Sequence, residues 1–114
     1  MVYVKRLSEI VQEGVIEEGA RNVTIQWLID QKAGAENFAM RRFAIKKGGN
    51  TPLHSHGWEH EVYVLSGKGT IRLGDEVFML EKDMFAYVPP NVVHQLKNAS
   101  DEDFTFLCIT QLKK

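Results

Sequence analysis

The chain has little of several features that assign proteins to common classes. Its single cysteine, Cys108, excludes an intrachain disulfide. The formal net charge is −1 and no run of roughly five or six like charges occurs, so nothing indicates a nucleic-acid or polybasic membrane surface. No apolar run approaches membrane-spanning length, and the N-terminal MVYVKRLSEIVQEG lacks the apolar stretch of a secretory signal. We expect a cytoplasmic protein that binds neither nucleic acid nor a membrane.

The composition is that of an ordinary globular protein. Hydrophobic residues make up 44% and charged residues 25% of the 114 residues, which argues against disorder. A chain of this length buries roughly two thirds of the surface that its unfolded state exposes, which is enough for one core. No repeat or linker divides it, so we expect a single domain over residues 1–114.

Short β-rich runs separated by turn residues are the strongest pattern in the chain. Gly74-Asp75 lies between two of these runs and predicts a hairpin turn. The only helical turn is expected over residues 7–13, with Ser8 as its candidate N-cap. Many short strands without a long helical period predict an all-β sandwich or barrel. The expected strands are residues 23–29, 38–45, 60–67, 70–73, 76–80, 85–89, 93–98 and 103–110.

All the histidines fall in one short stretch and one further position. His54, His56 and His60 form an H-x-H-x-x-x-H pattern, and His94 follows a turn at residues 89–91. On an extended chain the first two project to one face, and His60 keeps that parity if the loop returns to strand in register. A lone histidine is more often a surface or core residue. Four of them on β-structure predict a metal site, because transition metals bind neutral imidazole well.

Two stretches resemble the motifs of the cupin superfamily. Residues 48–67 read G-x5-H-x-H-x3-H-x6-G, which is similar to the first cupin motif, G-x5-H-x-H-x3,4-E-x6-G. Residues 83–98 read D-x5-P-x-N-x2-H-x3-N, which is similar to the second, G-x5-P-x-G-x2-H-x3-N. The resemblance implies a small single-domain cupin of the cupin 2 type, a jelly-roll or double-stranded β-helix barrel with a four-histidine metal site.

Three positions depart from these motifs. Asp83 and Asn91 stand at turn glycines, and Asn readily accepts the positive φ that such a turn requires. His60 stands where the family usually has glutamate, and Glu61 is the alternative ligand because the family also allows the longer spacing. Choosing Glu61 puts Gly67 out of register and reverses the strand parity, so the motif favours four histidines over three histidines and a carboxylate.

Four neutral ligands leave the full charge of a divalent ion on the metal. A tetrahedral set would be closed and would suit structural zinc. Four octahedral positions would leave two neighbouring ones for dioxygen, peroxide or a chelating substrate, and small four-histidine cupins look like this second case. Manganese is then the first candidate, with iron, copper, nickel or zinc as alternatives. Glu59 and Glu61 would orient a ligand imidazole or lie at the surface.

The resemblance also implies which residues surround the metal. Cupin barrels hold the metal inside one mouth, and Phe106 and Cys108 share a face of the last expected strand that would look inward. Cys108 is a soft ligand, a redox partner or simply a small buried hydrophobe. Arg41 and Arg42 alternate, so one of them should point inward, where a substrate carboxylate or a core acid would pair it. Cys108 and Arg41 are the candidate catalytic residues, and further pocket candidates, which core packing also explains, are Trp58, Tyr87 and Leu96.

A metal-dependent oxidoreductase of the dioxygenase type, acting on a small organic substrate, is the function we expect first. The alternatives are a non-catalytic cupin that binds a metal or small ligand, a sugar isomerase, and a structural zinc barrel. We also expect a homodimer, in which Val2, Tyr3 and Val4 could cover an exposed edge strand.

Overall fold

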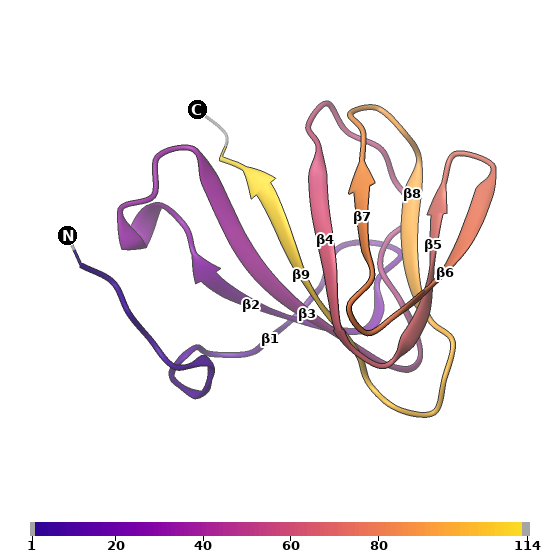
Figure 1. Ribbon diagram of the computed structural model, residues 1–114, viewed down its shortest axis with the longest axis horizontal. Helices are drawn as coiled ribbons and strands as arrows, with labels where there is room; N and C mark the ends of the chain where they lie inside the picture. The colour runs from indigo at the N-terminus through magenta and orange to yellow at the C-terminus, as the bar shows by residue number, and fades with distance from the viewer. Residues whose placement is uncertain (1, 113–114) are drawn as a thin grey trace.

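A computed structural model describes residues 2–112 and has the all-β architecture that the sequence predicts (Figure 1). Every pair of neighbouring strands is antiparallel, and together they form one nearly closed barrel with the strand order β6-β5-β8-β3-β9-β4-β7. Strands β1 and β2 lie off this path, with β2 beside β3. The strands are β1 (Glu13–Gly14), β2 (Arg21–Ile29), β3 (Phe38–Asn50), β4 (His60–Ser66), β5 (Lys68–Leu73), β6 (Glu76–Glu81), β7 (Phe85–Val88), β8 (His94–Asn98) and β9 (Phe104–Gln111).

The long strand β3 joins the two halves of the barrel. Its first part, Phe38 to Ile45, pairs with β9, and its last residue, Asn50, pairs with Lys97 of β8. In Figure 1, β2, β3 and β9 extend to the left while β4 to β8 curl into the closed part on the right. Strand β3 therefore connects β9, the C-terminal strand, to β8, the strand that carries His94.

The core lies inside the barrel and follows the strand alternation. Phe104 and Phe106 of β9, Ile45 of β3 and Val64 of β4 are almost completely buried. Gly69 of β5 allows the close packing at one end, because a Cβ there would lie 2.3 Å from the Phe104 ring. This end of the barrel is thus filled with apolar side chains, while the histidines occupy the opposite part of the interior.

The backbone at the two turn positions where the cupin motifs have glycine has the conformation that the sequence predicts. Asn91 and Asp83 both have positive φ, 66° and 68°, the left-handed conformation that Asn and Asp tolerate better than other non-glycine residues. Leu73 pairs with Glu76 across the expected Gly74-Asp75 hairpin turn. These turns set the register of the strands that follow them.

Two expectations about element boundaries were wrong. Strand β3 does not end at residue 45 but continues to Asn50. Gly48 takes the positive φ of 75° that this part of the strand requires, and Gly49 lets β2 approach closely, because a Cβ on Gly49 would lie 2.5 Å from the Arg21 carbonyl oxygen. The helical turn covers only the 3-10 helix η1 (Leu7–Glu9), and a second, unexpected one is η2 (Gln31–Ala33).

The N-terminal segment lies along β2. Ser8 is inside η1 and is not its N-cap; Arg6 holds that position, and its backbone N–H donates to the Glu9 carboxylate at 2.9 Å. The Tyr3 hydroxyl donates to the Leu28 carbonyl of β2 at 2.9 Å. Within residues 2–112, the helical turns are far too short to cross a membrane.

Candidate metal centre

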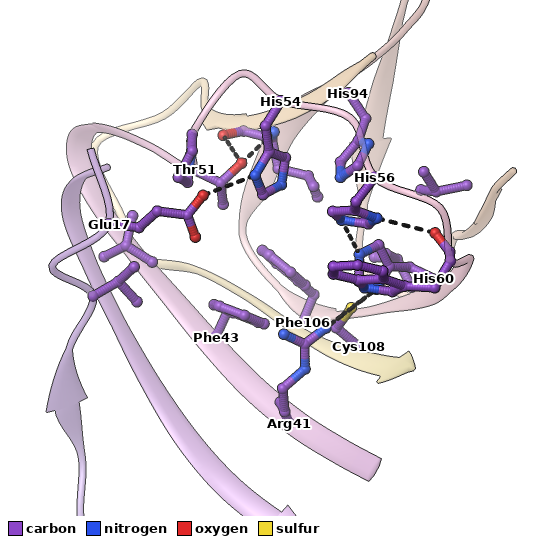
Figure 2. A pocket seen from close by; sticks show the side chains of 17 residues that line it. Glu17, Arg41, Phe43, Thr51, His54, His56, His60, His94, Phe106 and Cys108 are labelled. Atoms are coloured by element: carbon purple, nitrogen blue, oxygen red, sulfur yellow. Dashed lines mark hydrogen bonds and ion pairs between the residues drawn. The ribbon is translucent and has the colours of Figure 1, made fainter. Parts of the chain in front are cut away.

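The four histidines converge in one cavity of the barrel although they come from different segments (Figure 2). His54 and His56 lie in the segment between β3 and β4, while His60 begins β4 and His94 begins β8. His54 and His94 form an antiparallel bridge, with the His94 N–H donating to the His54 carbonyl at 2.9 Å. The Asn91 N–H donates to the His56 carbonyl at 2.7 Å, so the turn before β8 anchors the histidine segment.

Three of these side chains form a compact group of nitrogen donors. His54, His56 and His94 each offer one ring nitrogen, and these nitrogens all lie within 4.8 Å of one another. Zinc, for example, binds imidazole nitrogen at about 2.0–2.1 Å. Nitrogens that lie within 4.8 Å of one another can therefore surround one ion. The donor set is therefore suitable for a transition metal without a large rearrangement.

The outer nitrogens of the same three rings are held by acceptors. Nδ1 of His54 lies 2.8 Å from a carboxylate oxygen of Glu17, Nδ1 of His56 lies 3.0 Å from the Trp58 carbonyl, and Nδ1 of His94 lies 2.9 Å from the Val92 carbonyl. Because each Nδ1 then carries the proton, each Nε2 is unprotonated and has a lone pair. Metal-binding histidines are commonly oriented in this way.

His60 has different surroundings. Its Nδ1 lies 3.2 Å from Nη2 of Arg41 and 3.4 Å from Sγ of Cys108. A guanidinium can only donate, so Nδ1 of His60 accepts and the proton of the neutral ring sits on Nε2. That Nε2 lies 3.0 Å from Nε2 of His56 and donates to it. His60 thus lies beside the three-nitrogen group and presents an N–H to it.

Burial favours the neutral form of His56, His60 and His94, and metal ligands must be neutral imidazoles. Burial, followed by the charge of Arg41, lowers the pKa of His60 to about 3. Burial also lowers the pKa of His56 and His94, with neighbouring histidines contributing in the same direction. For Cys108, burial raises the pKa and so favours the neutral thiol, against the opposing effect of Arg41. The cavity therefore offers uncharged nitrogen and sulfur atoms at neutral pH.

The remaining lining of the cavity is largely apolar. The cavity has a volume of about 170 Å³. The Phe43 and Phe106 rings stack at 5.3 Å between centroids, and the Trp58 ring stacks on His56 at 4.0 Å. Four of the expected pocket residues line this cavity together with Arg41, namely Trp58, Leu96, Phe106 and Cys108.

Tyr87 was wrongly expected to line the cavity. It is 49% exposed, and its hydroxyl donates to the Glu59 carboxylate at 2.7 Å on the outside of the barrel. On β7 it is the next residue, Val88, that is buried and lines the cavity, so the alternation runs opposite to the expected parity. Glu61 is also exposed and does not line the cavity, whereas its neighbour His60 is buried there.

Sequence reasoning missed the carboxylate that contacts a histidine. It considered Glu59 and Glu61 for that role, but Glu17, between β1 and β2, contacts His54. No local pattern relates these two residues, which are 37 positions apart. Phe43 was also missed, although it lies two residues beyond Arg41 on β3 and so shares its face. Arg42, on the other face, donates to the Gln26 side chain at 3.0 Å.

Similar proteins have varied roles. Over 65 residues, 55% of this chain and 14% of the relative, the chain is 37% identical to xanthan biosynthesis protein XanB of Xanthomonas campestris. It is 26% identical to auxin-binding protein 1 of Arabidopsis thaliana over 93% of this chain and 57% of that protein. The chain thus spans only part of the length of these relatives.

A similar solved structure covers nearly the whole chain. The polyketide cyclase RemF from Streptomyces resistomycificus superposes with a TM-score of 0.93 at 29% identity, over 99% of this chain and 81% of that one. The model of the cupin domain family, Cupin_2, matches residues 41–110, which run from within β3 to within β9 and include all four histidines. The expected cupin family, without the metal site that the resemblance also implied, is therefore confirmed, and this chain belongs to the cupin domain family.

Proposed function

We propose that this chain is a metal-dependent oxidoreductase of the dioxygenase type that acts on a small organic substrate. The observation that carries the proposal is the compact group of three imidazoles whose Nδ1 atoms are held by acceptors, so that the unprotonated nitrogen of each ring is Nε2. The Nε2 lone pair of His56 accepts from His60 in this arrangement and becomes available to an ion when that N–H moves away. A bound divalent ion would supply a Lewis-acid centre and, for manganese, iron or copper, redox capacity.

The donor set fits such an ion. Neutral imidazole suits zinc, copper, iron and nickel, and geometry and availability decide among metals more than affinity does. Glu17 contacts His54 through Nδ1, so it would act as an orienting partner of the site. We keep manganese as the first candidate because of the likeness to four-histidine cupins, with iron, copper, nickel and zinc as alternatives.

His60 is the proposed fourth ligand. In the arrangement described above its Nε2 carries a proton, which must move to Nδ1 before Nε2 can ligate. Nδ1–H could then donate to the Cys108 sulfur at the present separation of 3.4 Å, provided that Arg41 no longer donates a hydrogen bond to Nδ1. The fourth position is thus coupled to the side chains behind it.

The chain's other residues would bind and orient the substrate. The stacked Phe43 and Phe106 rings offer an apolar wall for an organic body, and the neutral Cys108 thiol adds no charge to that wall. Besides the histidines and Arg41, few polar groups line the cavity, which speaks against a sugar isomerase, since hydroxyl-rich substrates require several hydrogen-bond partners.

A redox-neutral reaction on a similar substrate is the second candidate. The likeness to a polyketide cyclase over 99% of this chain favours it, and the same donors and apolar wall would serve it. The likeness to an auxin-binding protein is compatible with a role in binding alone.

Elemental analysis of tag-free protein, purified without chelator beside a His94→Ala variant, tests the proposal. Near-stoichiometric manganese, iron or copper in the parent and its loss in the variant support the metal site. Oxygen consumption with candidate substrates, compared with turnover under argon, then separates the oxidative from the redox-neutral reaction. No metal after reconstitution would refute both, and stoichiometric zinc would favour a structural role.

The homodimer remains a proposal as well. Val2 and Val4 are 92% and 85% exposed beside the β2 edge, and apolar side chains in that position are suited to cover an edge strand of a second copy. Sedimentation at micromolar protein tests this, and a monomeric mass would refute it.

A further inference from the structure

Arg41 is a cation inside the cavity that has no acidic partner. Among residues 2–112 none of the ion pairs includes it. Its Nη2 donates to the Cys108 sulfur, a weak acceptor, at 3.0 Å and to the neutral Nδ1 of His60 at 3.2 Å, so neither acceptor carries a charge. Its Nε is buried without any hydrogen-bond partner in the described chain. A partly buried guanidinium whose Nε has no acceptor is costly to desolvate unless something else pairs it.

The position of this side chain is set by its strand neighbours. In the register of the barrel Arg41 lies opposite Cys108 of β9 on one side and Trp27 of β2 on the other. Its guanidinium carbon lies 5.5 Å from the centre of the Trp27 ring and 5.1 Å from that of Phe43, within the range of cation–π attraction. Figure 2 shows the guanidinium beside Phe43, pointing toward His60 and Cys108. Arg41 is therefore held in place before any ligand arrives.

The charge of the cavity favours an anion. Glu17 is the carboxylate of the described lining, and it is already engaged by His54. Arg41 is the one arginine or lysine among the lining residues, and a guanidinium keeps its charge at all ordinary pH values. A carboxylate or phenolate would supply the acceptor that the protein does not provide.

The size and shape of the cavity favour a small ring. Its volume is about 170 Å³, whereas pockets for drug-sized ligands are about 300–1,000 Å³. An apolar cavity of about 150 Å³ is known to accept benzene. The stacked Phe43 and Phe106 rings, 18° from parallel, offer a flat wall against which one aromatic ring can lie.

We propose that Arg41 and the Phe43–Phe106 wall form a subsite for a small aromatic anion, a monocyclic carboxylate or phenolate. This inference deepens the proposed function by naming its substrate class, and it rests on that function only for the reaction, not for binding. The anion pairs with the guanidinium in place of the thiol and imidazole contacts, while the ring packs on Phe43. Removing the Arg41 contact from His60 would also free Nδ1 of that ring to carry a proton.

Titration calorimetry with benzoate and its neutral analogue benzamide tests the subsite. The parent is compared with Arg41→Gln and with Arg42→Gln, a matched control from the opposite face of the same strand. We expect benzoate to bind the parent and to bind Arg41→Gln about tenfold to a hundredfold more weakly, the size of a lost charge-assisted hydrogen bond. Arg42→Gln should match the parent, and benzamide should bind weakly and equally to all three.

Arg41→Lys keeps the design decisive if Arg41→Gln does not fold. Lysine keeps the charge but not the planar fork, so its benzoate affinity should fall between the parent and the glutamine variant. Thermal unfolding of each variant shows whether it is folded before it is titrated. Equal benzoate affinity in the parent and a folded Arg41 variant, equal binding of benzoate and benzamide, or no saturable benzoate binding by the parent would each overturn the subsite.

The titrations are made on both chelator-treated and manganese-treated protein, so that the two proposals can fail separately. Arg41-dependent benzoate binding by a protein that takes up no metal supports the subsite and refutes the metal site. Metal uptake together with Arg41-independent benzoate binding refutes the subsite alone.

Discussion

The two sides of the cavity present the same side chain, histidine, in opposite chemical settings. On one side His54, His56 and His94 place Nδ1 against a carboxylate or a backbone carbonyl. On the other side His60 places Nδ1 against the donor Arg41. An acceptor beside Nδ1 fixes the tautomer in which Nε2 is unprotonated, whereas a donor beside Nδ1 fixes the tautomer in which Nε2 carries the proton. Residue type and burial alone therefore do not show which nitrogen is available.

The difference begins in the strand pairing. Residues 51–59 pass along β8 and its preceding turn, where main-chain carbonyls are available as acceptors. His60 instead starts β4, whose neighbour β9 carries Cys108, and β9 in turn pairs with β3 at Arg41. Nδ1 of His56 therefore has a main-chain carbonyl beside it, whereas Nδ1 of His60, four residues later, has side chains beside it.

The largest effect should come from removing a histidine on the first side. His94→Ala removes one nitrogen of the compact group, so we expect manganese affinity to fall by more than the roughly 10–100-fold that loss of an orienting partner costs. His60→Ala should cost less, because its Nε2 carries a proton in the arrangement described. Calorimetric manganese titration of both variants measures the comparison, and an equal loss in the two would show that His60 and His94 contribute equally to metal binding.

Acid should destabilise the metal-free protein mainly through His60, on the side of the cavity that faces Arg41. The folded pKa of His60 is about 3 against an unfolded value of 6.5, so the unfolded chain binds the extra proton between these limits. Stability is complete above about pH 6.5 and falls with decreasing pH, by about 1.4 kcal/mol per pH unit for this one group. The lowered pKa values of His56 and His94 make the stability of the folded protein fall further as the pH decreases.

Urea unfolding of the chelator-treated protein across that pH range measures this slope. His60→Gln cannot take up the proton and should show a smaller slope, whatever its stability at neutral pH. An unchanged slope would mean that His60 does not have the depressed pKa that its burial gives it.

A smaller loss of metal affinity is expected from removing Glu17, the hydrogen-bond partner of the His54 ring. Glu17→Ala leaves Nδ1 of His54 without its acceptor, and manganese affinity should fall by roughly 10–100-fold. Glu59→Ala is the matched control, because that carboxylate contacts Tyr87 on the outside of the barrel. The same titration measures both, and a loss in the control equal to that in Glu17→Ala would point to general damage rather than to orientation of His54.

Local patterns predicted much of this molecule. Alternation and turn residues located eight of the strands, and motif spacing identified the four histidines that share the cavity. The choice of His60 over Glu61 as the inward residue rested on strand parity, and the buried position of His60 agrees with it. Such features depend on neighbours within a few residues, so the sequence expresses them directly.

The remaining features depend on contacts that local patterns do not express. Glu17 contacts His54 because β2 returns beside β3, and no spacing encodes that meeting. Tyr87 faces outward because β7 pairs with β4 in a register that puts Val88 inside. The tautomer of His60 depends on Arg41, 19 residues away on a strand that it does not adjoin.

The positions of the two tryptophans give each side of the cavity an optical reporter. The chain has only Trp27 and Trp58. Trp58 stacks on His56 at 4.0 Å, whereas Trp27 lies 5.5 Å from the guanidinium of Arg41. In Trp27→Phe the emission would come from the indole beside the metal-binding rings, and quenching by a paramagnetic ion would report their occupation. In Trp58→Phe it would come from the indole beside Arg41 and would report an arriving anion, so each event can be followed without the other.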